Sequence, residues 1–172
     1  MKGERMKKGL FWCALFSIYI FTYPLAIMAE SYISKADELY KRGGIENYKR
    51  SIDFYLKALK ENPTDYHANW KCARAYMKYG EDAKRQAIEG WKKICAEYGK
   101  EGMKYAEEAI RQEPDKPEGH YYFGLNAGTY SSGVSVFTAV AEGLKNKTQN
   151  SLEKAYELDE MYNEAGPILA LG

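Results

Sequence analysis

The side chains that could carry chemistry in this sequence are few and stand far apart. Its two histidines are His67 and His120. A metal site needs several ligands in one place, yet neither an H-x-x-x-H nor a C-x-x-C spacing occurs. No glycine-rich phosphate loop follows a strand, and no serine stands in a nucleophile elbow. The sequence therefore predicts no metal, no cofactor and no enzyme activity, with a hydrolase of hidden site as the catalytic alternative.

Cys72 and Cys95 are the cysteines that follow the N-terminal segment. An oxidising compartment would allow a bridge between them. The other interpretation is two small buried side chains on different helices. We favour the second, because spacing alone does not bring two β-carbons within bonding distance.

The first 29 residues have the layout of an export signal. Four basic residues precede an apolar run from Leu10 to about Thr22, and Pro24 and the small residues Ala26 and Ala29 follow. We expect cleavage after Ala29, which leaves a domain over 30–172 in the periplasm. The alternative is an uncleaved inner-membrane anchor, since residues 9–29 are just long enough to span a bilayer.

The charge balance argues against a nucleic-acid partner. The chain has 25 basic and 24 acidic residues, for a formal net charge of +1. Four of the basic residues lie in the N-terminal segment, so the remainder is slightly acidic. A surface that neutralises many phosphates is therefore not expected.

Apolar residues after residue 30 recur at intervals of three and four, which is the helical period. Three segments share a layout: 51–65, 102–116 and 150–162. In each segment, an apolar residue is followed three positions later by an alanine; these alanines are Ala58, Ala109 and Ala155. This internal repeat predicts an all-α fold of tetratricopeptide-like hairpins that form a short right-handed superhelix.

The predicted hairpins pair 31–42 with 47–61, 66–79 with a long helix over 83–112, and 117–130 with 147–159. Gly90, Gly99 and Gly102 fall inside the long helix, so we expect a kink near Gly99. A last helix over 163–172 has no partner in the sequence. Either the chain is a fragment that ends mid-repeat, or this helix packs on another subunit, which makes a homo-oligomer one of the expectations.

First helices of successive repeats line the inner wall of a superhelix. In the first repeat, the residues that we expect to line this inner wall are Ile33, Asp37 and Tyr40. The residues that we expect to form a partner or ligand groove in the next two repeats are His67, Trp70, Arg74, Met77, Tyr121, Leu125 and Thr129. Aromatic rings beside a few polar groups are typical of such grooves. The alternative is that the insertions fill the groove and these aromatics are core.

The segment 131–147 is an insertion in the repeat pattern. Phe137, Val140, Ala141 and Leu144 follow a helical spacing within it. They form either a second surface, for a partner or membrane, or one face of an extra helix packed on the array, which we favour.

The segment PEGHYYFGLNAG (117–128) combines small residues with aromatic ones. We expect Gly124, Ala127 and Gly128 to allow close helix packing. Tyr122 and Asn126 share another face and could hydrogen-bond to the long helix over 83–112. His120 is expected to be a packing or capping residue.

Two motifs resemble the T component of TPR-associated TRAP transporters, a bacterial periplasmic family. Its members carry P-E-G-H-Y-(Y/W)-x-G-x-N-x-G, which matches 117–128, and G-G-P-x-x-x-L-G, which matches 165–172 with Ala165 as the first residue. Together the motifs extend the resemblance over roughly 66–172. Eukaryotic regulators of microtubule dynamics show a related pattern, and the export signal argues against that branch. The chain also departs from the family, because it has no good lipidation site and stops where the family continues.

The resemblance implies a protein that binds the solute-binding subunit of a transporter and helps to deliver a small, hydrophobic ligand. The alternative is a general cell-envelope scaffold that binds peptides or assembly partners.

Overall fold

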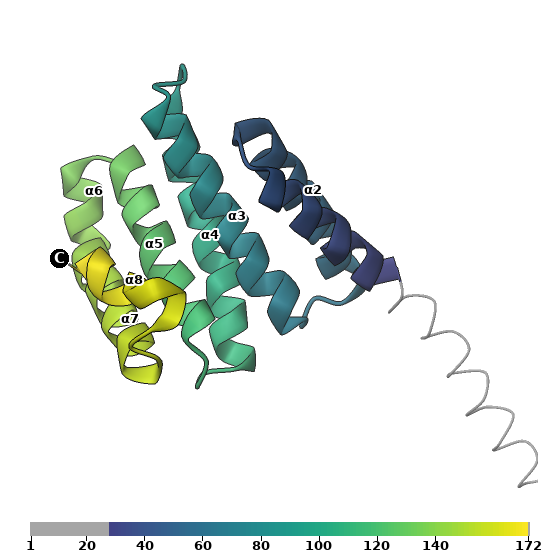
Figure 1. The fold of residues 1–172 in the computed structure, drawn as a ribbon. Helices are drawn as coiled ribbons and strands as arrows, with labels where there is room; N and C mark the ends of the chain where they lie inside the picture. Colours follow the sequence, from purple (N-terminus) through teal and green to yellow (C-terminus); the bar gives the residue numbers. More distant parts are fainter. Residues whose placement is uncertain (1–27, 172) are drawn as a thin grey trace, which may run out of the picture.

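The computed structural model describes residues 28–171, and this part of the chain is all-α (Figure 1). Residues 28–42 form the first helix, so the predicted cleavage site at Ala29 is already helical, while the rest of the predicted export segment lies outside the described residues. The helices that follow are α2 (Ile45–Glu61), α3 (Tyr66–Arg85), α4 (Trp91–Gln112), α5 (Pro117–Gly133), α6 (Val136–Ala141), α7 (Leu144–Leu158) and α8 (Tyr162–Leu171).

Helical hairpins stack side by side along the chain, as the repeat predicted. The helix over 28–42 pairs with α2, α3 pairs with α4, and α5 pairs with α7 (Figure 1). The repeated positions make the core: the paired residues Tyr55 and Ala58, Ala106 and Ala109, and Leu152 and Ala155 are each exposed by no more than 1%. The helical-repeat architecture is therefore confirmed.

The turn between α3 and α4 differs from the prediction. The long helix expected over 83–112 is wrong, because α3 continues to Arg85 and α4 begins only at Trp91. Buried Ala83 keeps the last turn of α3 on the core. Ala87 and Gly90 then take left-handed backbone angles, with φ of 50° and 74°. Glycine adopts such angles without a steric penalty, so Gly90 lies before α4 and not inside it.

No kink occurs at Gly99, because this glycine serves close packing instead. A β-carbon at Gly99 would lie 2.5 Å from the main-chain nitrogen of Tyr130. One at Gly102 would lie 2.0 Å from Oδ1 of Asn126. Helix α4 therefore remains continuous, and the two glycines let it touch the backbone and side chains of α5.

The insertion over 131–147 is shared among three helices. α5 extends to Gly133, the short α6 follows, and α7 starts at Leu144, three residues before the predicted start. Gly143, with φ of 63°, separates α6 from α7. Phe137 and Leu144 consequently belong to different helices and do not share one face.

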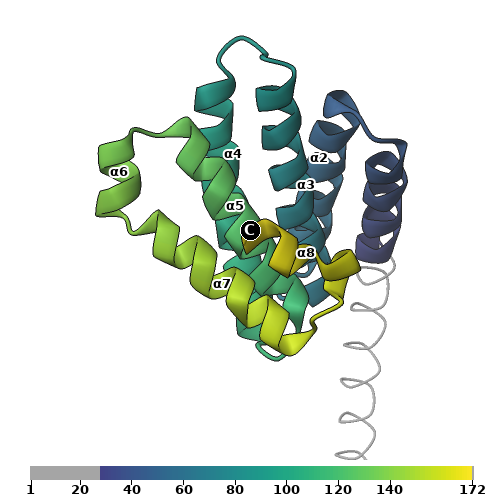
Figure 2. The ribbon, with the colours of Figure 1, turned by 60° about the vertical axis from the view of Figure 1, so that its left-hand side comes forward.

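The C-terminal helix α8 folds back over α5 and α7 (Figure 2). The predicted straight helix over 163–172 is broken at its start, because Asn163, Glu164 and Ala165 all have positive φ, between 50° and 61°. Gly166 follows and lies against the Tyr121 hydroxyl, where a β-carbon would come within 2.7 Å. Buried Pro167 then starts the regular part of the helix, a position that suits its fixed φ.

Candidate binding surface

One side of α3 carries a row of exposed and half-buried side chains, of which Trp70 also packs against the core. Ala68, Cys72 and Ala75 face the first cluster, and Ala73 and Met77 face the second. The remaining positions recur at three and four, so they share one face of the helix. We name this surface the inner strip; it consists of His67, Trp70, Lys71, Arg74 and Lys78 of α3 with Asp37 and Tyr40 of the preceding helix.

An ionic network joins the first hairpin to α3 within the inner strip. Asp37 accepts hydrogen bonds from the Tyr55 hydroxyl and from Lys71 Nζ, each at 2.6 Å. Arg74 lies farther away, with its Nη2 atom 3.7 Å from Asp37 Oδ1. The Arg74 guanidinium carbon also lies 3.9 Å from the centre of the Tyr40 ring. Two repeats are thus tied together by charge and by a cation–π contact.

Aromatic rings continue the surface from α3 to the C-terminus. Trp70 stacks on Tyr122 with ring centres 5.8 Å apart and planes 4° apart. Tyr121 then makes edge-on contacts with Tyr122 and Tyr162, and Asn163 donates a hydrogen bond to its hydroxyl at 3.1 Å. Burial raises the pKa of Tyr122 to about 12. Tyr121 and Tyr122 are buried in the middle of the row, whereas Trp70 and Tyr162 at its two ends are half-buried.

The residues predicted for the groove are therefore divided between surface and core. His67 is exposed, and Trp70, Arg74 and Leu125 are half-buried. Met77, Tyr121 and Thr129 are buried, with 3%, 6% and 8% exposure. Ile33, the first candidate of the first repeat, is buried as well, at 6%.

The buried groove candidates face neighbouring helices. Thr129 packs on Gly80 of α3, where a β-carbon would lie 2.6 Å from its Cγ2 atom. Tyr121 is covered by α8. The helical phase derived from the sequence could not include these two neighbours.

A wide hollow lies between α6, α7 and α8. It encloses about 910 Å³, and Val136, Val140, Leu144, Leu152 and Leu171 contribute to its wall. Phe137 and Val140, predicted as a second surface, are exposed by 88% and 74%. Leu144, predicted with them, is buried at 1% because it starts α7 against α5. α6 itself buries none of its residues, so the favoured expectation of a tightly packed extra helix is wrong.

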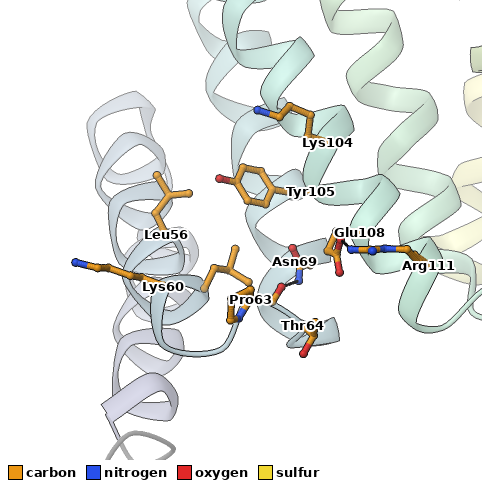
Figure 3. Close-up of a pocket in the computed structure, with 10 residues that line it drawn as sticks. Leu56, Lys60, Pro63, Thr64, Asn69, Lys104, Tyr105, Glu108 and Arg111 are labelled. Atoms are coloured by element: carbon orange, nitrogen blue, oxygen red, sulfur yellow. Dashed lines mark hydrogen bonds and ion pairs between the residues drawn. The ribbon is translucent and has the colours of Figure 1, made fainter.

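A second hollow, of about 460 Å³, lies between α2 and α4 (Figure 3). Leu56 and Tyr105 line its apolar side. Of its charged residues, Lys104 pairs with Glu101 at 2.9 Å, and Arg111 pairs with Glu108. The charges at this hollow are largely matched within the chain.

The motif at 117–128 has structural roles. His120 Nε2 lies 2.9 Å from the main-chain oxygen of Pro114, in the turn between α4 and α5, so it packs against that turn and caps neither helix. Gly124 packs on Leu152 of α7, as predicted, whereas Gly128 has open space where a β-carbon would lie. Asn126 does not bond to α4 as expected; it donates to the main-chain oxygen of Ala73 in α3.

Two residues of this surface, Lys71 and Tyr162, were missed by reasoning from the sequence. Lys71 lies next to Trp70 in the chain and belongs to the strip. Buried Tyr122, which was expected to hydrogen-bond to the long helix, stacks on Trp70. Tyr162 joins the aromatic row only because α8 turns back. The spacing of Lys71 from His67 and Arg74 could have identified it; nothing in the spacing indicated Tyr162.

Of the cysteines in the described part of the chain, Cys72 and Cys95 are both buried and are not bonded to each other, as favoured above. Within residues 28–171, no group of three or more His, Cys, Asp or Glu side chains is placed to hold a metal ion. Nor does any helix of that part have the length and apolar content needed to cross a membrane.

Stacked helical hairpins define the class: an all-α helical-repeat protein. Comparison with protein-family models adds the family. Residues 32–169 match the family described as Regulator of microtubule dynamics protein 1-3. The chain therefore belongs to this family. We excluded the microtubule-dynamics family because of the predicted export signal, and the match shows that this exclusion was wrong. No curated protein sequence matches the chain.

Proposed function

We propose that this chain is a non-catalytic binding protein whose inner strip holds a segment of a protein partner. The observation that carries the proposal is the accessible Trp70–Arg74 pair, with the guanidinium carbon 5.0 Å from the indole ring centre. Tryptophan and arginine are the side chains that most often dominate interface energy.

The finer role proposed is binding to a transporter's solute-binding subunit in the periplasm. It rests on the motifs at 117–128 and 165–172 and on the export-type sequence before residue 30. The hollow between α6, α7 and α8, with its valine and leucine wall, has the size and character for a small hydrophobic ligand. A general scaffold for envelope peptides is the alternative, and it would use the same strip.

The family name favours a second candidate, a role in microtubule dynamics. Co-sedimentation with polymerised tubulin and fractionation of cells that express the full chain separate the two candidates. Recovery in the periplasmic fraction supports the transporter role. Sedimentation with microtubules and retention in the cytoplasm support the other.

The binding experiment compares two tryptophan variants in a titration against a periplasmic solute-binding protein of a TRAP transporter from the same genome. Trp70→Ala should weaken the complex by about 2 kcal/mol or more, with little loss of helix content. Trp91→Ala, at the start of α4 and outside the strip, is the matched control and should bind as the unchanged chain does. Equal binding by both variants would move the partner surface elsewhere. Assays on generic ester and peptide substrates test the absence of hydrolase activity.

A further inference from the structure

The Arg74 guanidinium is poorly satisfied by its own chain. Its Nε atom is buried and has no hydrogen-bond partner among the described residues. Its ion pair with Asp37 spans 3.7 Å, which is longer than a hydrogen bond. An arginine carries five N–H donors in a fixed planar fork. Several of these donors therefore remain available to a ligand.

Asp37 does not supply the missing acceptors. Its Oδ2 atom accepts from Lys71 and its Oδ1 atom from the Tyr55 hydroxyl, each at 2.6 Å. One carboxylate thus serves two cations, which leaves an excess of one positive charge at this point of the strip. Lys78, one turn further along α3, pairs with Glu81 at 3.0 Å and does not change the excess.

Two aromatic rings hold the guanidinium in one orientation. Its carbon lies 3.9 Å from the Tyr40 ring centre and 5.0 Å from that of Trp70. Stacking occupies the faces of a guanidinium and leaves the donors at its edge, which match a carboxylate in the same plane. The Arg74 side chain keeps 20% of its surface exposed. Because Nε is buried, a ligand would reach the guanidinium at its Nη atoms.

We propose that Arg74 binds the carboxylate of an acidic side chain within a continuous segment of the partner, while Trp70 contacts an apolar neighbour in that segment. This inference rests on the proposed function and names the chemistry of the partner. Arg74 stands in the middle of the strip, with His67 and Trp70 before it and Lys78 after it along α3. A bound segment would continue past Arg74 in both directions along the strip. The carboxylate that meets Arg74 therefore belongs to a side chain and not to a chain terminus.

Three N-acetylated hexapeptides test the inference by calorimetric titration into the full chain. The first contains a phenylalanine and two glutamates and has an amidated end. The second replaces both glutamates with glutamine, and the third has no acidic side chain but a free terminal carboxylate. Only the first should bind saturably, and its affinity should fall as salt is added.

Matched variants locate the effect. Arg74→Gln should weaken the glutamate peptide at least tenfold, and Arg74→Lys, which keeps the charge but loses the fork, should recover little of that loss. Tyr40→Leu keeps the arginine and removes one stacking face, so it should weaken binding several-fold. Arg85→Gln, at the exposed end of α3 and paired there with Asp82, should leave binding unchanged. Circular dichroism confirms that each variant is folded.

Several outcomes overturn the inference. They are equal binding of the glutamine peptide, preference for the free terminal carboxylate, no saturable binding of any peptide, and full-strength binding by the folded Arg74→Gln variant. The proposed function and this inference can fail separately: if Trp70→Ala weakens binding of the protein partner while Arg74→Gln does not, the proposed function stands and only the inference about a carboxylate fails.

Discussion

The side-chain amide of Asn126 in α5 donates a hydrogen bond to the main-chain oxygen of Ala73 in α3, over 3.0 Å. The same nitrogen donates to the main-chain oxygen of Tyr122 at 2.8 Å. Asn126 is fully buried. One amide therefore joins the second and third hairpins across an interface that is otherwise made of small and aromatic residues.

Asn126→Ala should lower the free energy of unfolding by about 1–3 kcal/mol, because it removes the hydrogen bonds to the main-chain oxygens of Ala73 and Tyr122 and leaves space in the buried interface. Urea denaturation followed by circular dichroism measures the loss. Asn150→Ala, on the exposed face of α7, is the control and should stay within about 0.5 kcal/mol of the unchanged chain. A similar midpoint for both variants would show that the Asn126 bond contributes nothing.

The contact between Asn126 and Gly102 should appear as an energetic coupling. Gly102→Ala places a β-carbon 2.0 Å from Asn126 Oδ1, so it should destabilise the chain. In an Asn126→Ala background this clash is removed, and the same change gains helix propensity of up to about 1 kcal/mol. A double-mutant cycle should give a coupling of about 0.5–3 kcal/mol. Additive effects would contradict the packing described for α4 and α5.

Gly124 and Gly128 should respond to alanine in opposite directions. A β-carbon at Gly124 would lie 2.7 Å from Leu152 Cγ, whereas nothing lies within 4 Å at Gly128. Gly124→Ala should therefore destabilise the chain, and Gly124→Leu should do so by about 1–3 kcal/mol. Gly128→Ala should stabilise it by up to about 1 kcal/mol through helix propensity. Thermal melts of the three variants test the sign, and a stabilising Gly124→Ala would mean that α7 lies farther from α5.

Ala165→Gly should stabilise the chain, although glycine usually weakens helices. Ala165 has φ of 61°, in the left-handed region that glycine enters freely. Relief of this conformation should raise stability by about 1 kcal/mol. Ala170→Gly, in the regular part of α8, should lower it by a similar amount. Two shifts of the same sign in the melting temperature would show that the reversed turn at 163–165 is absent in solution.

Alkaline pH should unfold the domain over a defined range. Burial raises the pKa values of Tyr105 and Tyr122 from 10.0 to about 12. Because their pKa values are higher in the folded than in the unfolded chain, these two tyrosines contribute their full stabilisation of the fold below pH 10. That contribution is lost as pH rises through about 12.

Circular dichroism and tyrosinate absorbance, recorded together against pH, check this range. Helix loss should accompany ionisation of the buried tyrosines, and a variant with Tyr105→Phe and Tyr122→Phe should unfold at higher pH. Full ionisation near pH 10 with the helices intact would contradict the burial of these rings.

The sequence was sufficient for the repeat because the positions that it aligned are the ones that the hairpins bury. Tyr55, Ala106 and Leu152 follow from local spacing, and so does the pairing of their helices. The groove was predicted less well, since a helical period gives a direction but not the neighbours on that side. Thr129 meets Gly80 and Tyr121 meets α8, and both contacts depend on residues distant in sequence.

The errors at glycine have one physical origin. The same residue can break a helix, as Gly90 does with its left-handed angle, or admit a neighbouring helix, as Gly99 does within a continuous one. Only the position of the neighbouring backbone decides between these roles. The reversed turn at 163–165 could not be predicted for a related reason, because two of its three residues, Glu164 and Ala165, are good helix formers.

The notches at Gly99 and Gly102 have a mechanical consequence. Two helices that are separated by side chains can slide past each other when those side chains change rotamer. Helices whose backbones are in direct contact cannot move in this way. α4 and α5 should therefore move as a single rigid unit, and their amide hydrogens should exchange slowly. The first hairpin and α6 to α8, which flank this unit, should be more flexible. Trp70 and Arg74 lie on α3, which packs beside these two helices. A partner that binds them contacts a rigid surface, so little conformational entropy of this chain is lost on binding.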